Sequence, residues 1–150
     1  MGTRRKGREI ALQLLYEIDS SHKTLQEILS EKLHLRFPYD EEVPALDEQE
    51  RILEFAQSLL KGVKENQDKI DETIERYSTH WKISRMAIVD RNILRIATYE
   101  MQYCPDVPIS VSINEAIDLA KTFGSEDSSS FINGVLDHIA KVLREVPKFS

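Results

Sequence analysis

The sequence has little of what strands, disulfides and tight turns require. Only five glycines and five prolines occur in 150 residues, too few for an all-β protein rich in turns. The single cysteine, Cys104, excludes an intrachain disulfide and favours a reducing compartment. Because Cys104 stands just before Pro105, we expect a small half-buried residue at a helix end rather than a thiol nucleophile.

Long apolar runs are missing too. No stretch approaches the ~20 apolar residues that span a bilayer. The N-terminus, MGTRRKGREIALQLL, lacks the unbroken apolar region and the cleavage site of a secretory signal. Hydrophobic residues make up 41% of the chain and charged residues 31%, which is typical of a folded soluble protein. We therefore expect a cytoplasmic protein that makes no membrane contact.

Motifs that carry catalysis or bind cofactors are also absent. The four histidines, at positions 22, 34, 80 and 138, lie on different segments without the spacing of metal ligands. There is no P-loop, GxGxxG or GxSxG motif, and the serine run 128–130 has no histidine base beside it in sequence. Pairs of the many carboxylates could still converge in space, but we expect no enzyme, no cofactor and no metal site.

Apolar residues at the helical spacings of three and four are abundant. They predict about seven helices and no strand, near residues 4–20, 24–35, 47–63, 66–80, 85–103, 112–123 and 128–143. Residues 36–46 hold two prolines and an acidic cluster and predict a loop. Because the composition shifts near residue 80, we expect one all-α domain over residues 1–150. It would consist of two small bundles packed against each other, about 1–80 and about 81–150.

Several residues have the chemistry of helix ends. Asp47 and Ser112 are each followed by a glutamate three residues later, as in a capping box. The other expected N-caps are Ser84 and either Ser128 or Ser129. Gly124 is expected to end the preceding helix at its C′ position, with Phe123 on the inward face.

Charge is unevenly distributed along the chain. The net charge is −6, yet Arg4, Arg5, Lys6 and Arg8 give residues 1–8 a charge of +4 and leave −10 for the rest. We call these four residues the basic head. Arg4 and Arg8 lie one helical turn apart, so their forked donors suit phosphates, although a merely solvated terminus is the plainer interpretation. Gly7 weakens the first turn by roughly 1 kcal/mol relative to alanine, so we expect a terminus that a partner orders.

Two further segments carry polar or aromatic residues at informative places. FGSEDSSSFINGVLD (123–137) joins one helix end to the N-terminus of the next, where the helix dipole suits an anion. Phe131 lies in that first turn, either as a core residue or as a platform on which an unstacked base can sit. Within ILRIATYEM, Arg95 and Glu100 are expected to be buried polar anchors, and Arg91 a surface charge.

Three stretches together carry a specific resemblance. They are RRKGREIALQLLYEID (4–19), DRNILRIATYEM (90–101) and DVPISVSINEAIDLAKTFGSEDSSSFINGVLDHI (106–139). With these motifs in this order, the chain resembles the bacterial NusB family of transcription antitermination factors; residues 21–80 share a helical pattern but little motif. The resemblance implies an all-helical fold and binding of boxA-type single-stranded RNA in ribosomal RNA operon transcripts. It also implies a heterodimer with the ribosomal protein NusE that joins the RNA polymerase elongation complex.

The same resemblance implies individual site residues. RNA contacts fall on Arg4, Arg5 and Arg8, and on Asp127 and Phe131 near the last helix. Asp90 falls on the NusE-facing surface. Some relatives carry a lysine just before the phenylalanine, where this chain has Ser130. Without that cation, more of the phosphate binding is expected from the arginines of the N-terminus. Some members form homodimers, and the sequence leaves monomer and homodimer open.

Other functions are compatible with these residues. A non-catalytic helical scaffold for protein interactions, with the basic N-terminus on an acidic partner, would have the same pattern. The fold also occurs as the RNA-binding appendage of ribosomal RNA cytosine methyltransferases, but this chain ends at Ser150 without a cofactor-binding domain. For RNA binding with three or four neutralised phosphates, log K should fall with log salt at a slope of about −2 to −3.

Overall fold

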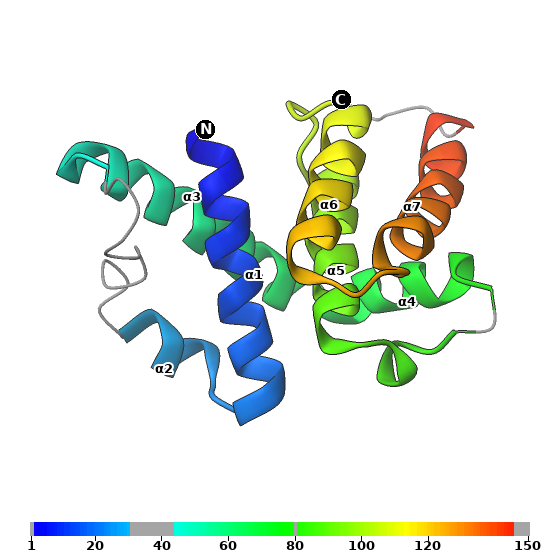
Figure 1. Cartoon of the computed structure of the whole chain (residues 1–150), viewed down its shortest axis with the longest axis horizontal. Helices are drawn as coiled ribbons and strands as arrows, with labels where there is room; N and C mark the ends of the chain where they lie inside the picture. The colour runs from blue at the N-terminus through cyan, green and yellow to red at the C-terminus, as the bar shows by residue number, and fades with distance from the viewer. Residues whose placement is uncertain (1, 31–43, 80, 146–150) are drawn as a thin grey trace. The chain divides into compact units, whose positions relative to one another are not determined.

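A computed structural model describes residues 2–30, 44–79 and 81–145, and over these ranges the chain is helical with no strand. Figure 1 labels the α-helices along the chain. In chain order they are α1 (Thr3–Ser21), α2 (Leu25–Ser30), α3 (Leu46–Glu65), α4 (Gln67–Tyr77), the 3₁₀ turn η2 (Ile83–Arg85), α5 (Ile88–Tyr103), α6 (Ile109–Phe123) and α7 (Ser128–Glu145). The prediction of an all-α fold with about seven helices is confirmed. The predicted end of the second helix near 35, most of the 36–46 loop, His34 and His80 lie outside the described residues.

The contacts divide the chain into two compact units, Met1–Lys64 and Glu65–Ser150. The composition shift had suggested a division near residue 80. The boundary lies earlier because α4 packs on α5 and α7 of the second unit. Ile70 and Ile74 of α4 are fully buried.

The first unit is built around the apolar face of α1. Ala11, Leu14, Leu15 and Ile18 recur on α1 at spacings of three and four and are buried, as is Ile28 of α2, which packs on α1. The buried residues of α3 recur at the same spacing: Ile52, Ala56, Leu59, Leu60 and Val63. Burying each leucine or isoleucine contributes about 1.5–3 kcal/mol, so this face, more than helix propensity, holds the unit together.

In the second unit α5 is the central helix, in contact with α4, α6 and α7. Its inner face is apolar and continuous with the faces of its neighbours. The buried residues are Ile93, Leu94, Ile96, Ala97 and Met101 of α5, Ala116, Leu119 and Ala120 of α6, and Ile132, Val135, Leu136, Ile139 and Ala140 of α7.

The start of α6 differs from the prediction. Ser112 is not an N-cap: the helix begins at Ile109, and Ser112 lies a turn inside it, 1% exposed and with no hydrogen-bond partner for its hydroxyl. The carbonyl of Pro108 already accepts the N–H groups of Val111 and Ser112. The buried face then runs through Ser112 and Ala116, which leaves Phe123 38% exposed rather than inward.

Two other predicted caps were also wrong. Asp47 lies inside the first turn of α3, which starts at Leu46, and pairs with Arg51 at 3.6 Å. Ser84 lies within η2, and α5 begins only at Ile88. A capping interaction forms instead at Thr24, whose Oγ1 accepts the N–H of Glu27 at 3.1 Å and donates to its carboxylate.

A partly buried ion pair anchors α5 to α4. Arg95 is 4% exposed, and its guanidinium donates to both carboxylate oxygens of Asp71, at 2.8 and 3.0 Å, and to Asn92 Oδ1 at 3.0 Å. Glu100, on the same helix, is 2% exposed. The predicted burial of Arg95 and Glu100 is therefore confirmed, and the contact with Asp71 confirms Arg95 as an anchor. Its bidentate geometry makes Arg95 difficult to replace by lysine.

We expect Asp71→Asn to lower the free energy of unfolding by about 3 kcal/mol, because it leaves the buried Arg95 cation without its counter-charge. Urea denaturation measures the loss. The matched control is Glu72→Gln on the next residue, whose partner Arg76 lies 3.3 Å away with both side chains largely exposed. That exposed pair should contribute less than about 1 kcal/mol. Equal effects of the two substitutions would contradict the assignment.

Candidate nucleic-acid interface

The basic head is part of a regular helix. α1 begins at Thr3, and the N–H of Lys6 already bonds to the carbonyl of Gly2 at 3.3 Å. The expectation of a terminus left without structure until a partner orders it was therefore wrong. The reason lies at Gly7, which is buried against α3. A Cβ built there would lie 2.6 Å from Phe55 Cδ2 and 3.2 Å from the carbonyl oxygen of Ile52.

Phe55 also lies beneath two of the arginines. The guanidinium carbon of Arg4 is 5.5 Å from the centroid of the Phe55 ring, and that of Arg8 is 5.6 Å from it. These are cation–π distances, each contributing about 0.5–1 kcal/mol or more when desolvated. The absence of a side chain at Gly7 lets the ring come close enough to α1 to orient both guanidinium groups.

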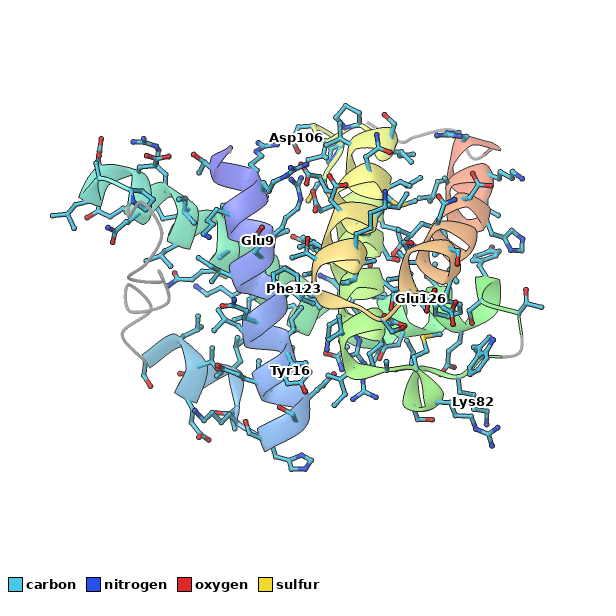
Figure 2. All side chains as sticks on the ribbon, viewed as in Figure 1. Glu9, Tyr16, Lys82, Asp106, Phe123 and Glu126 are labelled. Atoms are coloured by element: carbon cyan, nitrogen blue, oxygen red, sulfur yellow. The ribbon has the colours of Figure 1, made fainter. Side chains whose placement is uncertain are left out.

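The residues of the basic head differ in exposure. Arg4 is exposed and Arg5 half-buried, whereas Arg8 is only 3% exposed. Lys6 lies 3.6 Å from the carboxylate of Glu9, which offsets part of its charge. Figure 2 labels Glu9 and, further along α1, Tyr16, which is 43% exposed. Within the basic head, Arg4 and Arg5 are thus the arginines most accessible to a phosphate, and Arg8 chiefly packs on Phe55.

The second candidate region is the turn between α6 and α7, where Figure 2 labels Glu126. Gly124 ends α6 as predicted, but with an extended backbone, φ −92°, rather than a left-handed one. Close packing requires a glycine at this position, since a Cβ there would lie 2.6 Å from both Cβ and Oγ of Ser128. The backbone N–H of Ser125 donates to Ser128 Oγ at 2.9 Å, which closes the turn.

The same serine joins this turn to α5. Ser128 Oγ donates to Asp90 Oδ1 at 2.6 Å, and its residue is 2% exposed. Asp127 precedes α7, and its carbonyl accepts the N–H of Phe131 at 3.2 Å. The hydrogen bond from Ser128 therefore fixes Asp90, Asp127 and the first turn of α7 with respect to one another.

These residues surround a cavity of about 350 Å³. Its lining comes from the segment before α5, from α5 itself, from the α6–α7 turn and from α7: Trp81, Arg85, Met86, Ala87, Asp90, Ser125, Asp127 and Phe131. Trp81 is 50% exposed, and its ring meets the half-buried ring of Phe131 edge to face, with centroids 6.1 Å apart. An exposed indole beside a cavity is a surface on which a planar group can stack.

The structure brings three of the predicted site residues together, and the other three belong to the other unit. Asp90, Asp127 and Phe131 line one cavity in the second unit, while Arg4, Arg5 and Arg8 lie on α1 of the first. Sequence reasoning missed Trp81, Arg85 and Phe55. Trp81 is the only tryptophan in the chain, and that was the one signal that could have found it.

An anion has little reason to bind at the start of α7. Ser130 directs its hydroxyl back to the carbonyl of Asp127 at 3.2 Å, and the carboxylates of Asp90 and Asp127 are both close by in the cavity wall. These two negative charges offset the positive end of the α7 dipole and repel an incoming anion. Within the described segments, no three His, Cys, Asp or Glu side chains are grouped to hold a metal ion. None of the described helices is long and apolar enough to cross a membrane.

Comparison with known proteins gives consistent matches. The model of the NusB family matches residues 5–141. A protein of Geotalea uraniireducens named transcription antitermination protein NusB is 48% identical over 143 residues, covering 95% of this chain and 97% of that protein. A protein of the same name from Myxococcus xanthus is 43% identical over 145 residues, covering 97% and 99%.

Solved structures agree. NusB of T. maritima superposes with a TM-score of 0.74 at 36% identity, covering 95% of this chain and 97% of that one. A structure described as antitermination factors NusB and NusE in complex with dsRNA matches with a TM-score of 0.76 at 26% identity. It covers 95% of this chain and 98% of the matched one.

We expect Gly7→Ala to destabilise the first unit despite the better helix propensity of alanine. Propensity favours alanine by about 1 kcal/mol, but forcing a methyl group to 2.6 Å from Phe55 costs about 1–3 kcal/mol. The control is Gly134→Ala in α7, where a Cβ would meet nothing within 4 Å and should be neutral or stabilising. Thermal or urea unfolding distinguishes them, and stabilisation by both substitutions would show that the Gly7–Phe55 contact is not tight.

Proposed function

Because the chain belongs to the NusB family, we propose that it is a non-catalytic transcription antitermination factor that binds boxA-type single-stranded RNA in ribosomal RNA operon transcripts. In this function it binds RNA together with the ribosomal protein NusE, as part of an RNA polymerase antitermination complex. The names of its relatives and the solved complex of NusB and NusE with RNA support the proposal. Transcription places such a protein in the cytoplasm.

The observation that carries the proposal in this chain is the presentation of the basic head. Arg4 is held over Phe55 on an ordered helix that begins at Thr3, with Arg5 beside it. Arginines fixed in this way bind consecutive backbone phosphates without a large ordering cost. The rest of the chain carries a charge of −10, which opposes RNA elsewhere and suits a basic ribosomal protein.

The second contact is assigned to Phe131 and Asp127. Phe131 offers a half-buried ring on which a base can stack, and Asp127 offers a carboxylate that accepts hydrogen bonds from a base edge but repels phosphate. RNA recognition is then divided: Arg4 and Arg5 bind the backbone, and the cavity of the second unit contacts a base. Asp90, held by Ser128, is the proposed contact for the protein partner.

Substituting Arg4 and Arg5 together by alanine should weaken binding to a boxA-type strand about tenfold or more at moderate salt. It should make the slope of log K against log salt less steep by about 1.4, because two phosphate contacts at about 0.7 each are lost. Fluorescence anisotropy at several salt concentrations measures both quantities.

The control is Arg51→Ala on α3, which removes an exposed cation outside the basic head and should leave the slope unchanged. A scrambled strand and a duplex of the same sequence serve as competitors. If scrambled and boxA-type strands bind equally, or the double substitution has no effect, the chain acts instead as a protein-interaction scaffold whose basic N-terminus contacts an acidic partner.

Ser130→Lys should strengthen RNA binding and steepen the salt slope by about 0.7, because it adds one cation near the proposed base contact. The exposed position tolerates the change, although a lysine in the first turn costs about 0.3–1 kcal/mol against the helix dipole. The same titrations measure the slope. The control is Ser129→Lys on the neighbouring position, and an equal gain from both would indicate non-specific attraction.

A further inference from the structure

We propose that Ser128 is a positioning residue for the contact with the protein partner. Its hydroxyl holds the carboxylate of Asp90 in one orientation, in which the second oxygen, Oδ2, receives a lysine or arginine side chain of the partner. This inference rests on the proposed function, in which Asp90 contacts a basic ribosomal protein. It adds Ser128 and Ser125 to that contact as residues that act through Asp90.

The direction of the hydrogen bonds around Ser128 follows from its single hydroxyl proton. Ser128 Oγ lies 2.6 Å from Asp90 Oδ1, 3.1 Å from Ser125 Oγ and 2.9 Å from the backbone nitrogen of Ser125. An ionised carboxylate only accepts hydrogen bonds, so the proton of Ser128 goes to Asp90. The hydroxyl of Ser125 must therefore donate to Ser128, as its backbone N–H does. With two hydrogen bonds accepted and one donated, the hydroxyl of Ser128 has a single orientation.

Close packing holds Ser128 itself in place. It is the first residue of α7 and is 2% exposed. A Cβ at Gly124 would lie 2.6 Å from its Cβ and Oγ, so the turn leaves room for the serine and for little else. In a chain of hydrogen bonds each bond polarises the next and strengthens it. The chain from Ser125 through Ser128 ends at Asp90 and therefore fixes the orientation of that carboxylate.

Asp90 has the exposure and the open acceptor that a contact with a partner requires. It lies in the first turn of α5, is half-buried and lines the cavity. Within the described residues its carboxylate bonds to Ser128 through Oδ1, and Oδ2 is left open. The charge of −10 beyond residue 8 favours a basic protein as the occupant. Because the side chain of Asp90 is already ordered, the partner binds without the entropy loss of fixing it.

The other charged residues of the cavity lack this arrangement. The backbone carbonyl of Asp127 accepts from the N–H of Phe131 and the hydroxyl of Ser130, but its exposed carboxylate makes no hydrogen bond or ion pair within the described residues. A partner would therefore have to order that side chain on binding. Arg85 forms no ion pair with Asp90 in the described part of the chain, which leaves this carboxylate to a cation from outside.

The test measures the affinity of the full-length chain for purified NusE, without RNA, by isothermal titration calorimetry. Ser128→Ala should weaken binding about two- to tenfold, because Asp90 must then be ordered by the partner. Asp90→Asn keeps an acceptor for Ser128 but removes the charge, and should weaken binding about tenfold or more. The control is Ser129→Ala at the neighbouring half-buried position, which should leave the affinity unchanged.

Combining the substitutions distinguishes a positioning role from a structural one. If Ser128 acts through Asp90, adding Ser128→Ala to Asp90→Asn should change the affinity by less than about twofold. Ser125→Ala, at an exposed position, should give a smaller loss than Ser128→Ala, and none in the Asp90→Asn background. Thermal unfolding of each variant is measured in parallel. A Ser128→Ala variant with a lower unfolding temperature but unchanged affinity, or with an equal loss of affinity in both backgrounds, would overturn the proposal.

A second set of titrations, of each variant with a boxA-type strand, separates this inference from the proposed function. If the unsubstituted chain binds NusE and RNA, and Ser128→Ala alters neither affinity, the function stands and the positioning role is wrong. If Asp90→Asn leaves the affinity for NusE unchanged, the partner contact lies elsewhere and the inference fails, while RNA binding through Arg4 and Arg5 stands. If the unsubstituted chain does not bind NusE, both are wrong.

Discussion

The hydrogen bond from Ser128 to Asp90 is the constraint on which the second candidate surface depends. At 2.6 Å, between a buried hydroxyl and a carboxylate, it is a strong charge-assisted bond. It joins the first turn of α5 to the first turn of α7, and Ser128 in turn receives the N–H of Ser125 and occupies the space left free by Gly124. One side chain thus fixes both walls of the cavity and the start of the helix that carries Phe131.

The helices could be predicted from the sequence far better than their ends. Apolar spacing identified every α-helix in the described residues because burial on one face repeats with the helical period. Capping patterns were unreliable because the same four-residue signature occurs at Thr24 and at Ser112, and only Thr24 forms the contact. At Ser112 the preceding Pro108 starts the helix earlier, and burial of Val107 and Ile109 holds that start in place. The start of α6 is therefore set by the packing of apolar residues rather than by the capping signature at Ser112.

The site was predicted in part, and the missing part follows from how contacts form. Asp127 and Phe131 were predicted from the family motif. Trp81 and Arg85 lie between α4 and α5, where no repeating apolar pattern indicates which side chains meet. Their approach to Phe131 depends on the packing of α5 against α7, and no local sequence pattern predicts that packing. Arg8 illustrates the converse: its charge suggested a phosphate contact, whereas its 3% exposure and its position over Phe55 make it chiefly a packing residue.

The fit of Gly7 against Phe55 has a thermodynamic consequence for association. A disordered arginine-rich terminus would lose roughly 1–2 kcal/mol of backbone entropy for every residue that RNA ordered. Here α1 extends to Thr3, because the glycine allows close contact with α3. The heat-capacity change on binding should then reflect only the surface that RNA covers, without the additional term that accompanies folding of a segment.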